Sequence, residues 1–197
     1  WAEMQEAERS GGREFSRIEK PPNRPFRYFS TRFIMYLQFL FVGIYFGFSM
    51  GIAPPLGYAY GDGKLNICRK LERYAHLFFA IAPIIIYLLT YFLAPVGVSC
   101  FTEQTSPVFS TAISGMRIYG LGFLFSGINI FAAVRMMTYG KGYCSGLITF
   151  LRSFALLLLF LIVLPIKFGL TGIWLAVSAA EAMTLPVAVW FLRPIQM

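Results

Sequence analysis

Residues 33–61 read FIMYLQFLFVGIYFGFSMGIAPPLGYAYG and contain no Asp, Glu, Lys, Arg or His. A helix of about 20 apolar residues crosses the hydrocarbon core of a bilayer, so this stretch is long enough to span a membrane with some tilt. Residues 77–102 form a second stretch without a charged side chain. These two stretches predict the first two transmembrane helices of the chain.

Three further apolar stretches follow, each interrupted by at most two charged residues. Backbone polar groups in hydrocarbon must be satisfied within the segment, and runs of this length suit helices better than the roughly ten-residue strands of a barrel. The sequence therefore predicts an all-α, polytopic transmembrane helix bundle. Its five transmembrane helices are expected at about residues 33–60, 77–99, 108–136, 146–166 and 168–192.

The composition agrees with a membrane protein. Of the 197 residues, 57% are hydrophobic and only 13% are charged, whereas charged residues make up about a quarter of ordinary soluble domains. This balance excludes a soluble enzyme, a disordered chain and a disulfide-rich secreted module. The net charge of +8 comes from bases scattered between apolar runs, which the positive-inside rule explains better than nucleic-acid binding.

The connections between the spans alternate in charge. The connection over residues 62–76 carries four Lys and Arg residues, whereas the next one, over residues 99–111, carries Glu103 and no base. The third connection, over residues 135–145, is basic again. Because positively charged loops stay in the cytoplasm, we expect the first and third connections and the C terminus on the cytoplasmic side.

Residues 1–32 break this alternation, because they carry seven Lys and Arg residues and precede an odd number of spans. Their cluster of Pro21, Pro22 and Pro25 is typical of a flexible polar segment. We therefore expect a membrane domain over residues 33–197 after a flexible lead-in over residues 1–32. Either an upstream membrane part is missing or this lead-in is non-native. The alternative is a basic arm that binds the membrane surface.

Catalytic and metal-binding constellations are hard to assemble from this chain. His76 is the only histidine, which excludes sites with two or three His ligands. The three cysteines, Cys68, Cys100 and Cys144, have no CxxC spacing. We therefore expect no metal site, no disulfide and no enzymatic activity. For His76 we favour an interfacial imidazole over a proton relay.

Polar residues inside the spans are the candidates for a substrate or ion path, because a charge at mid-bilayer costs about 3 to 10 kcal/mol and faces a bundle interior or an aqueous path. Glu181 is either a path carboxylate or, as we favour, a structural acid paired with Arg117 or Arg152. For Arg117 itself we favour a structural or interfacial role, and for Asn129 an interhelical hydrogen bond. Gln38 is a further neutral candidate.

Prolines and glycines give two more expectations. A proline inside a span frees backbone carbonyl groups, which transporters use for hinges, although packing kinks are the commoner outcome. The hinge candidates are Pro54, Pro55 and Pro186. A spacing of four residues predicts a small-residue packing face on the first span, made by Gly43, Gly47 and Gly51.

Four groups of residues stand in order and at helix-length spacing: GIAPPLGYAYG at 51–61, MRIY at 116–119 with GINI at 127–130, LR at 151–152, and FGLTGIWLA at 168–176. They resemble, respectively, the end of the eighth helix, the tenth helix, the start of the eleventh and the turn into the twelfth helix of multidrug and toxic compound extrusion (MATE) transporters. The resemblance covers about residues 33–191.

The resemblance implies twelve helices in two six-helix lobes around a central cavity, with the five spans as helices eight to twelve of a partial C-terminal lobe. It implies exchange of Na⁺ or H⁺ for organic, often cationic, compounds by alternating access, with no other cofactor. The implied partners are the lipid bilayer, drug-like substrates and the missing N-terminal lobe. Acids proposed for coupling in the family lie in the first, seventh and tenth helices, and the span over residues 108–136 has no acid.

The sequence therefore favours a fragment of a multidrug efflux antiporter of a bacterial inner membrane, inactive on its own. One alternative is a lipid-linked oligosaccharide flippase of the same superfamily, although its cavity should be strongly basic and only Arg117 and Arg152 are obvious candidates. Another is a membrane scaffold protein that transports nothing. A membrane-embedded enzyme ranks last, because one His and one buried Glu leave little for acid–base chemistry.

Overall fold

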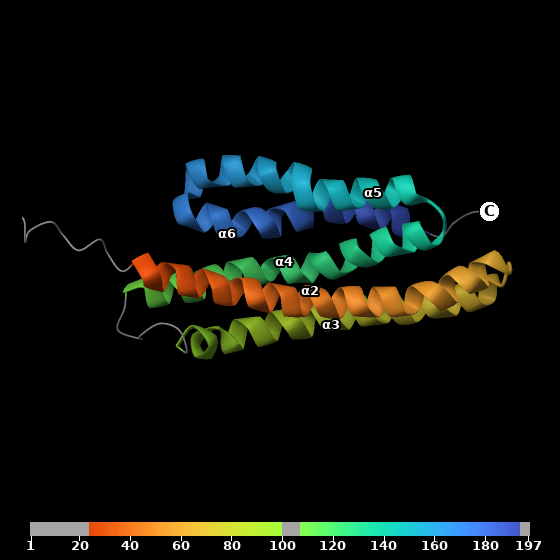
Figure 1. Cartoon of the computed structure of the whole chain (residues 1–197), viewed down its shortest axis with the longest axis horizontal. Coiled ribbons are helices and arrows are strands. Elements are labelled where there is room, and N and C mark those ends of the chain that lie inside the picture. Colours follow the sequence, from red (N-terminus) through yellow and green to blue (C-terminus); the bar gives the residue numbers. More distant parts are fainter. Residues whose placement is uncertain (1–23, 100–106, 194–197) are drawn as a thin grey trace, which may run out of the picture.

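The fold is an all-helical bundle, shown in Figure 1. The computed structural model describes residues 24–99 and 107–193, and all its regular elements in these ranges are helices. They are α2 (Arg24–Gly61), α3 (Leu65–Ser99), α4 (Pro107–Thr138), α5 (Gly142–Phe150), the π-helical turn η1 (Leu151–Ala155) and α6 (Leu156–Leu192).

Five segments of the described residues are long and apolar enough to cross a membrane, which confirms the predicted fold class and marks the chain as a membrane protein. Figure 1 shows two layers, one with α2, α3 and α4 and the other with α5, η1 and α6. The five segments are Gln38–Gly61, Leu65–Ser99, Ala112–Thr138, Gly142–Gly169 and Thr171–Leu192.

The second span begins earlier than predicted. α3 starts at Leu65, directly after a turn in which Gly63 has a φ of 71°, so the predicted loop over residues 62–76 is wrong. Its basic side chains lie on the exposed side of a helix, whereas Cys68 and Ala75 on the same helix are buried. The charge count locates the start of the uncharged stretch at residue 77, but α3 begins twelve residues earlier, at Leu65.

Two other boundaries also move outward. α2 starts at Arg24, so residues 24–32 of the predicted lead-in are helical, while residues 1–23 lie outside the described residues. α4 continues past Arg135, so this residue lies in a helix and the predicted connection over residues 135–145 is wrong at its start. Both helices are longer than a bilayer is thick, because polar residues extend them beyond their apolar stretches.

The fourth and fifth spans are separated by a reversal at Gly169, where φ is 56° and ψ is −132°. A side chain with a Cβ atom is strained in this conformation, so the turn requires glycine. Close packing follows at Gly172, where an added Cβ atom would overlap the backbone of Leu164 and Pro165. These two glycines let the chain turn back on itself within a few residues.

α4 lies at the centre of the bundle and contacts α2, α3, α5 and α6. Small residues on α4 allow this approach: a Cβ atom at Gly115 would lie 2.6 Å from the Trp174 ring, and one at Gly127 would lie 3.0 Å from Phe79. Phe79 in turn packs against Tyr45 of α2, with the ring centroids 5.9 Å apart. Membrane helices associate through such close contacts at small residues.

The predicted small-residue packing face of the first span is wrong for the described structure. Gly43, Gly47 and Gly51 are exposed, and nothing lies within 4 Å of a Cβ atom built on any of them. Lipid and protein interior are equally apolar, so glycine spacing alone does not say which side of a membrane helix faces a neighbour.

The proline candidates lie inside continuous helices. α2 runs through Pro54 and Pro55, and α6 runs through Pro186. The non-helical residue within α6 is Gly169. The use of the three prolines as hinges stays a prediction.

Candidate functional site

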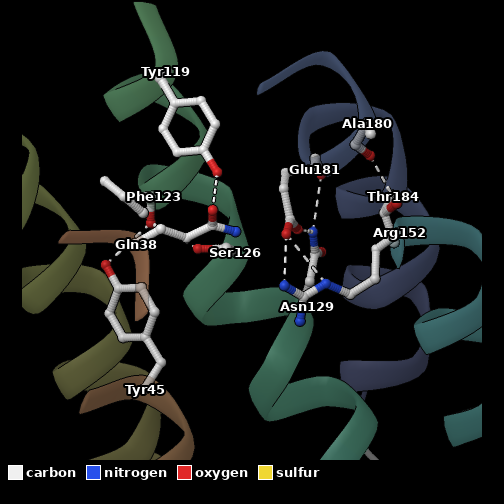
Figure 2. Close-up of polar contacts among 10 residues, drawn as sticks. All are labelled: Gln38, Tyr45, Tyr119, Phe123, Ser126, Asn129, Arg152, Ala180, Glu181 and Thr184. Carbon is white, nitrogen blue, oxygen red and sulfur yellow. Dashed lines mark hydrogen bonds and ion pairs between the residues drawn. The ribbon is translucent and has the colours of Figure 1, made fainter. Parts of the chain in front are cut away.

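A buried polar cluster centred on Glu181 lies between α4, η1 and α6 (Figure 2). Arg152 Nη2 lies 2.6 Å from Glu181 Oε1, and Arg152 Nε also donates to this oxygen over 3.2 Å. Asn129 Nδ2 donates to Glu181 Oε2 over 2.7 Å and to the Glu181 carbonyl oxygen over 2.9 Å. Both carboxylate oxygens therefore have a partner, and Glu181 is only 7% exposed.

Arg152 reaches this carboxylate from an irregular turn. It is the second residue of η1, a π-helical turn between α5 and α6. A π-turn places an extra residue in the helix and is frequently found at functional sites. The sequence predicts two partners for Glu181, and the structure selects Arg152.

Asn129 makes the interhelical hydrogen bond that the sequence predicts, and the acceptor is Glu181. Asn129 is fully buried, and its Oδ1 atom has no hydrogen-bond partner among the described residues. Because Nδ2 already donates to the carboxylate, the amide cannot flip without placing two acceptors face to face. The cluster therefore contains one acceptor oxygen that remains to be satisfied.

A small cavity of about 70 Å³ adjoins the cluster. Its lining includes Gln38 of α2, Tyr119 and Ser126 of α4, Arg152 and Glu181. The Tyr119 hydroxyl donates to Gln38 Oε1, so α2 also joins the polar wall, as Figure 2 shows. A space of this size holds a few water molecules or one small ion.

Arg117 lies apart from this site. Its guanidinium carbon is 4.2 Å from the centroid of the Tyr91 ring on α3, a cation–π geometry. This contact agrees with the structural role that we favour. Three of the four path candidates, Glu181, Asn129 and Gln38, contact the cluster or its cavity, and Arg117 does not.

The sequence reasoning missed a second polar cluster, formed by Glu72, Arg135 and Tyr139. Arg135 Nε donates to Glu72 Oε1, and Tyr139 donates to the same oxygen over 2.6 Å. Arg135 Nη1 also donates to the Phe191 carbonyl oxygen over 2.9 Å, which ties α3 and α4 to the end of α6. The signal was present, since Glu72 is the one acid in a basic run.

The Tyr139 hydroxyl stays protonated in this cluster. Burial and then the hydrogen bond to the Glu72 carboxylate raise the pKa of Tyr139 above its usual value of 10.0. The proton is retained because a phenolate would face a carboxylate in a buried place.

Of the cysteines that the structure describes, neither Cys68 nor Cys144 donates or accepts a hydrogen bond in the two clusters. Cys68 is a buried free thiol and Cys144 is a half-buried one. Cys100 lies outside the described residues. Within the described residues, no group of three or more His, Cys, Asp or Glu side chains is placed to hold a metal ion.

No known protein family, no curated protein and no solved structure matches this chain.

Proposed function

We propose that this chain is part of a cation-coupled antiporter of the MATE type, which exports organic, often cationic, compounds in exchange for Na⁺ or H⁺. The observation that carries the proposal is the Glu181 carboxylate, buried inside a membrane bundle beside a small cavity and balanced by the Arg152 guanidinium. An intramembrane ionisable group with a path to a cavity is by default a functional group.

Stability alone is a poor reason for this pair. A buried ion pair contributes little or nothing relative to apolar side chains of the same volume, because both charges lose their hydration. The Arg152 and Glu181 side chains are only 12% and 10% exposed. A pair that is costly to bury is better explained by a task that needs the carboxylate.

The proposed task is exchange at one carboxylate. Arg152 acts as the resident cation of Glu181, and both residues line the cavity. A proton, a sodium ion or an organic cation that binds Glu181 displaces the guanidinium, and one carboxylate cannot hold two of these at once. Mutual exclusion at a shared site is the thermodynamic basis of antiport.

The cavity lies where the two helix layers meet, which fits alternating access. Gln38 and Tyr119 belong to the layer of α2, α3 and α4, whereas Arg152 and Glu181 belong to the layer of η1 and α6 (Figure 1). Release of Arg152 would loosen the contact of η1 with α6 and let the layers rearrange. Rocking of one helix group against another is the usual transporter motion.

The charge distribution supports an orientation in a bacterial inner membrane. The turns after α2 and after α4 lie at the same end of the bundle as the end of α6 (Figure 1). This end carries exposed Lys and Arg side chains, which favours the cytoplasmic side. We propose that a further membrane part of the transporter completes the central cavity, so that this chain supplies one wall and performs no transport by itself.

Binding of labelled guanidinium, an organic cation small enough for the cavity of about 70 Å³, to the full chain in nonionic detergent tests the proposal. We expect saturable binding that weakens as the proton or Na⁺ concentration rises, because these cations compete for Glu181. Glu181→Gln should abolish the binding and Glu181→Asp should retain part of it. Asp62→Asn, which removes an exposed acid in the turn after α2, is the matched control and should bind like the wild type.

Two results would overturn the proposal. One is equal binding by Glu181→Gln and the wild type, which would mean that the carboxylate is not the site. The other is binding by the wild type that neither protons nor Na⁺ weaken, which would mean that these cations do not compete with the organic cation for Glu181. Monodispersity of each variant on size exclusion separates loss of the site from loss of the fold.

A further inference from the structure

A second and larger hollow, of about 490 Å³, lies between α3, α4 and α6. Its residues differ from those of the Glu181 cavity, so what it binds does not depend on the proposed antiport. Two of its residues are polar, and the others are apolar. Its walls include His76 and Ala80 of α3, Ile128 and Phe131 of α4, and Val189 and Arg193 at the end of α6.

The groove is polar at its mouth and apolar in its depth. His76 and Arg193 lie nearest the basic end of the bundle, whereas Ala80, Ile128 and Val189 lie one turn or more further into the spans. This gradient follows the change from the bilayer surface to hydrocarbon. A molecule that fills the groove should have a polar end at the surface and an apolar part that lies along the helices.

Positive charge gathers at the mouth. Arg69, Arg73, His76 and Ala80 have the spacing i, i+4, i+7 and i+11, so they share one face of α3. Arg69 and Arg73 are exposed and stand on the surface side of His76. Arg193 approaches the same mouth from α6.

The nearest acid does not cancel this charge. The Glu72 carboxylate receives hydrogen bonds from Arg135 and Tyr139, so it is turned toward α4 and already paired. The Glu72 carbonyl oxygen accepts a hydrogen bond of 2.6 Å from His76 Nδ1, which fixes the imidazole at the rim. The ring also contacts Phe131 edge to face, with centroids 5.6 Å apart.

We propose that this groove binds an anionic phospholipid, with one acyl chain on Ala80, Ile128 and Val189 and the phosphate at Arg73 and Arg193. An apolar slot in the membrane with a cationic rim at the surface complements this ligand in both polarity and charge. Basic pockets between helices at the cytoplasmic surface bind anionic headgroups in this way. A zwitterionic lipid would fill the apolar part of the groove equally well, but its headgroup would be attracted less strongly to the basic mouth.

Native mass spectrometry of the delipidated full chain tests the proposal, with phosphatidylglycerol and phosphatidylcholine of identical acyl chains as ligands. We expect phosphatidylglycerol to bind more tightly than phosphatidylcholine. Arg73→Gln and Arg193→Gln should each weaken phosphatidylglycerol about fivefold, the factor for loss of one basic residue near a charged headgroup. Lys64→Gln removes the same charge from the turn before α3, where Lys64 pairs with Asp62 outside the groove, and should leave the affinity for both lipids unchanged.

The apolar part of the groove is tested separately from its basic mouth. Ala80→Trp fills the groove with a large side chain and should weaken both lipids while leaving the basic residues in place. Equal affinity for the two lipids would overturn the proposal, and so would an effect of Lys64→Gln as large as that of Arg73→Gln. Displacement of phosphatidylglycerol by millimolar inorganic phosphate would assign the rim to free phosphate and leave the groove without a role. The exposed Arg variants keep the test valid if Ala80→Trp does not fold.

Discussion

Arg152 and Glu181 are 29 positions apart in the chain, yet their side chains meet at 2.6 Å inside the bundle. The turn at Gly169 reverses the chain between them, and the π-turn η1 presents the guanidinium to α6. Asn129 then links the same carboxylate to α4. One acid thus joins three helical segments.

Removing one partner of this pair should harm the fold more than removing both. Glu181→Leu or Arg152→Leu leaves a buried charge without its counter-charge, which typically costs about 3–5 kcal/mol. The double variant leaves no charge and should be more stable than either single variant. Chemical unfolding in nonionic detergent gives the three free energies. Additive effects of the two substitutions would mean that the side chains do not interact.

The Tyr139 cluster predicts a pH dependence. Folding raises the pKa of the Tyr139 hydroxyl. Above pH 10 the unfolded state therefore releases a proton that the folded state keeps, and the free energy of unfolding falls as the pH rises. The wild type should therefore be more stable than Tyr139→Phe by a constant margin between about pH 7 and 9. Above about pH 10 the margin should shrink by up to about 1.4 kcal/mol per pH unit. A margin that stays constant to pH 11 would contradict the buried, carboxylate-bound hydroxyl.

The sequence predicted the number of spans because that number depends only on the length of apolar runs. It predicted two partners for Glu181 and could not choose between Arg117 and Arg152, because the choice depends on how the helices are rotated. In soluble helices the apolar face reveals this rotation. In these spans the lipid-facing and the buried sides are both apolar, so the spacing of apolar residues does not reveal which side of the helix is buried.

Other features lay beyond the sequence patterns for the same reason. Gly43, Gly47 and Gly51 have the spacing of a packing face and are exposed, whereas the glycines that do pack lie on α4. The start of α3 was missed because exposed bases in a helix look like a loop when only charge is counted. Glu72 was overlooked among those bases, although it is the acceptor for Arg135 and Tyr139.

Glycine substitutions should separate the two kinds of glycine. Gly115→Ala places a Cβ atom 2.6 Å from the Trp174 ring, and overpacking of this kind typically costs about 1–3 kcal/mol. Gly47→Ala meets nothing within 4 Å and should be neutral or stabilising by about 0.5–1 kcal/mol, because alanine favours a helix. Unfolding in detergent measures both. Equal destabilisation by the two substitutions would contradict the placement of α4 at the centre of the bundle.

The two ends of the bundle give the last prediction. The turn with Asp62 and the turn with Lys141 lie at one end, and the reversal next to Lys167 lies at the other (Figure 1). In a background with the native cysteines replaced, an impermeant maleimide should label Asp62→Cys and Lys141→Cys from the same side of the membrane. Lys167→Cys should react only from the opposite side, because the segment Gly142–Gly169 is long and apolar enough to span the bilayer. Intact cells and inverted vesicles distinguish the sides, and the basic end should be labelled in inverted vesicles. Labelling of Lys141→Cys and Lys167→Cys from one side would mean that the segment between them does not cross the membrane, and the buried Glu181 cluster would then lose its membrane setting.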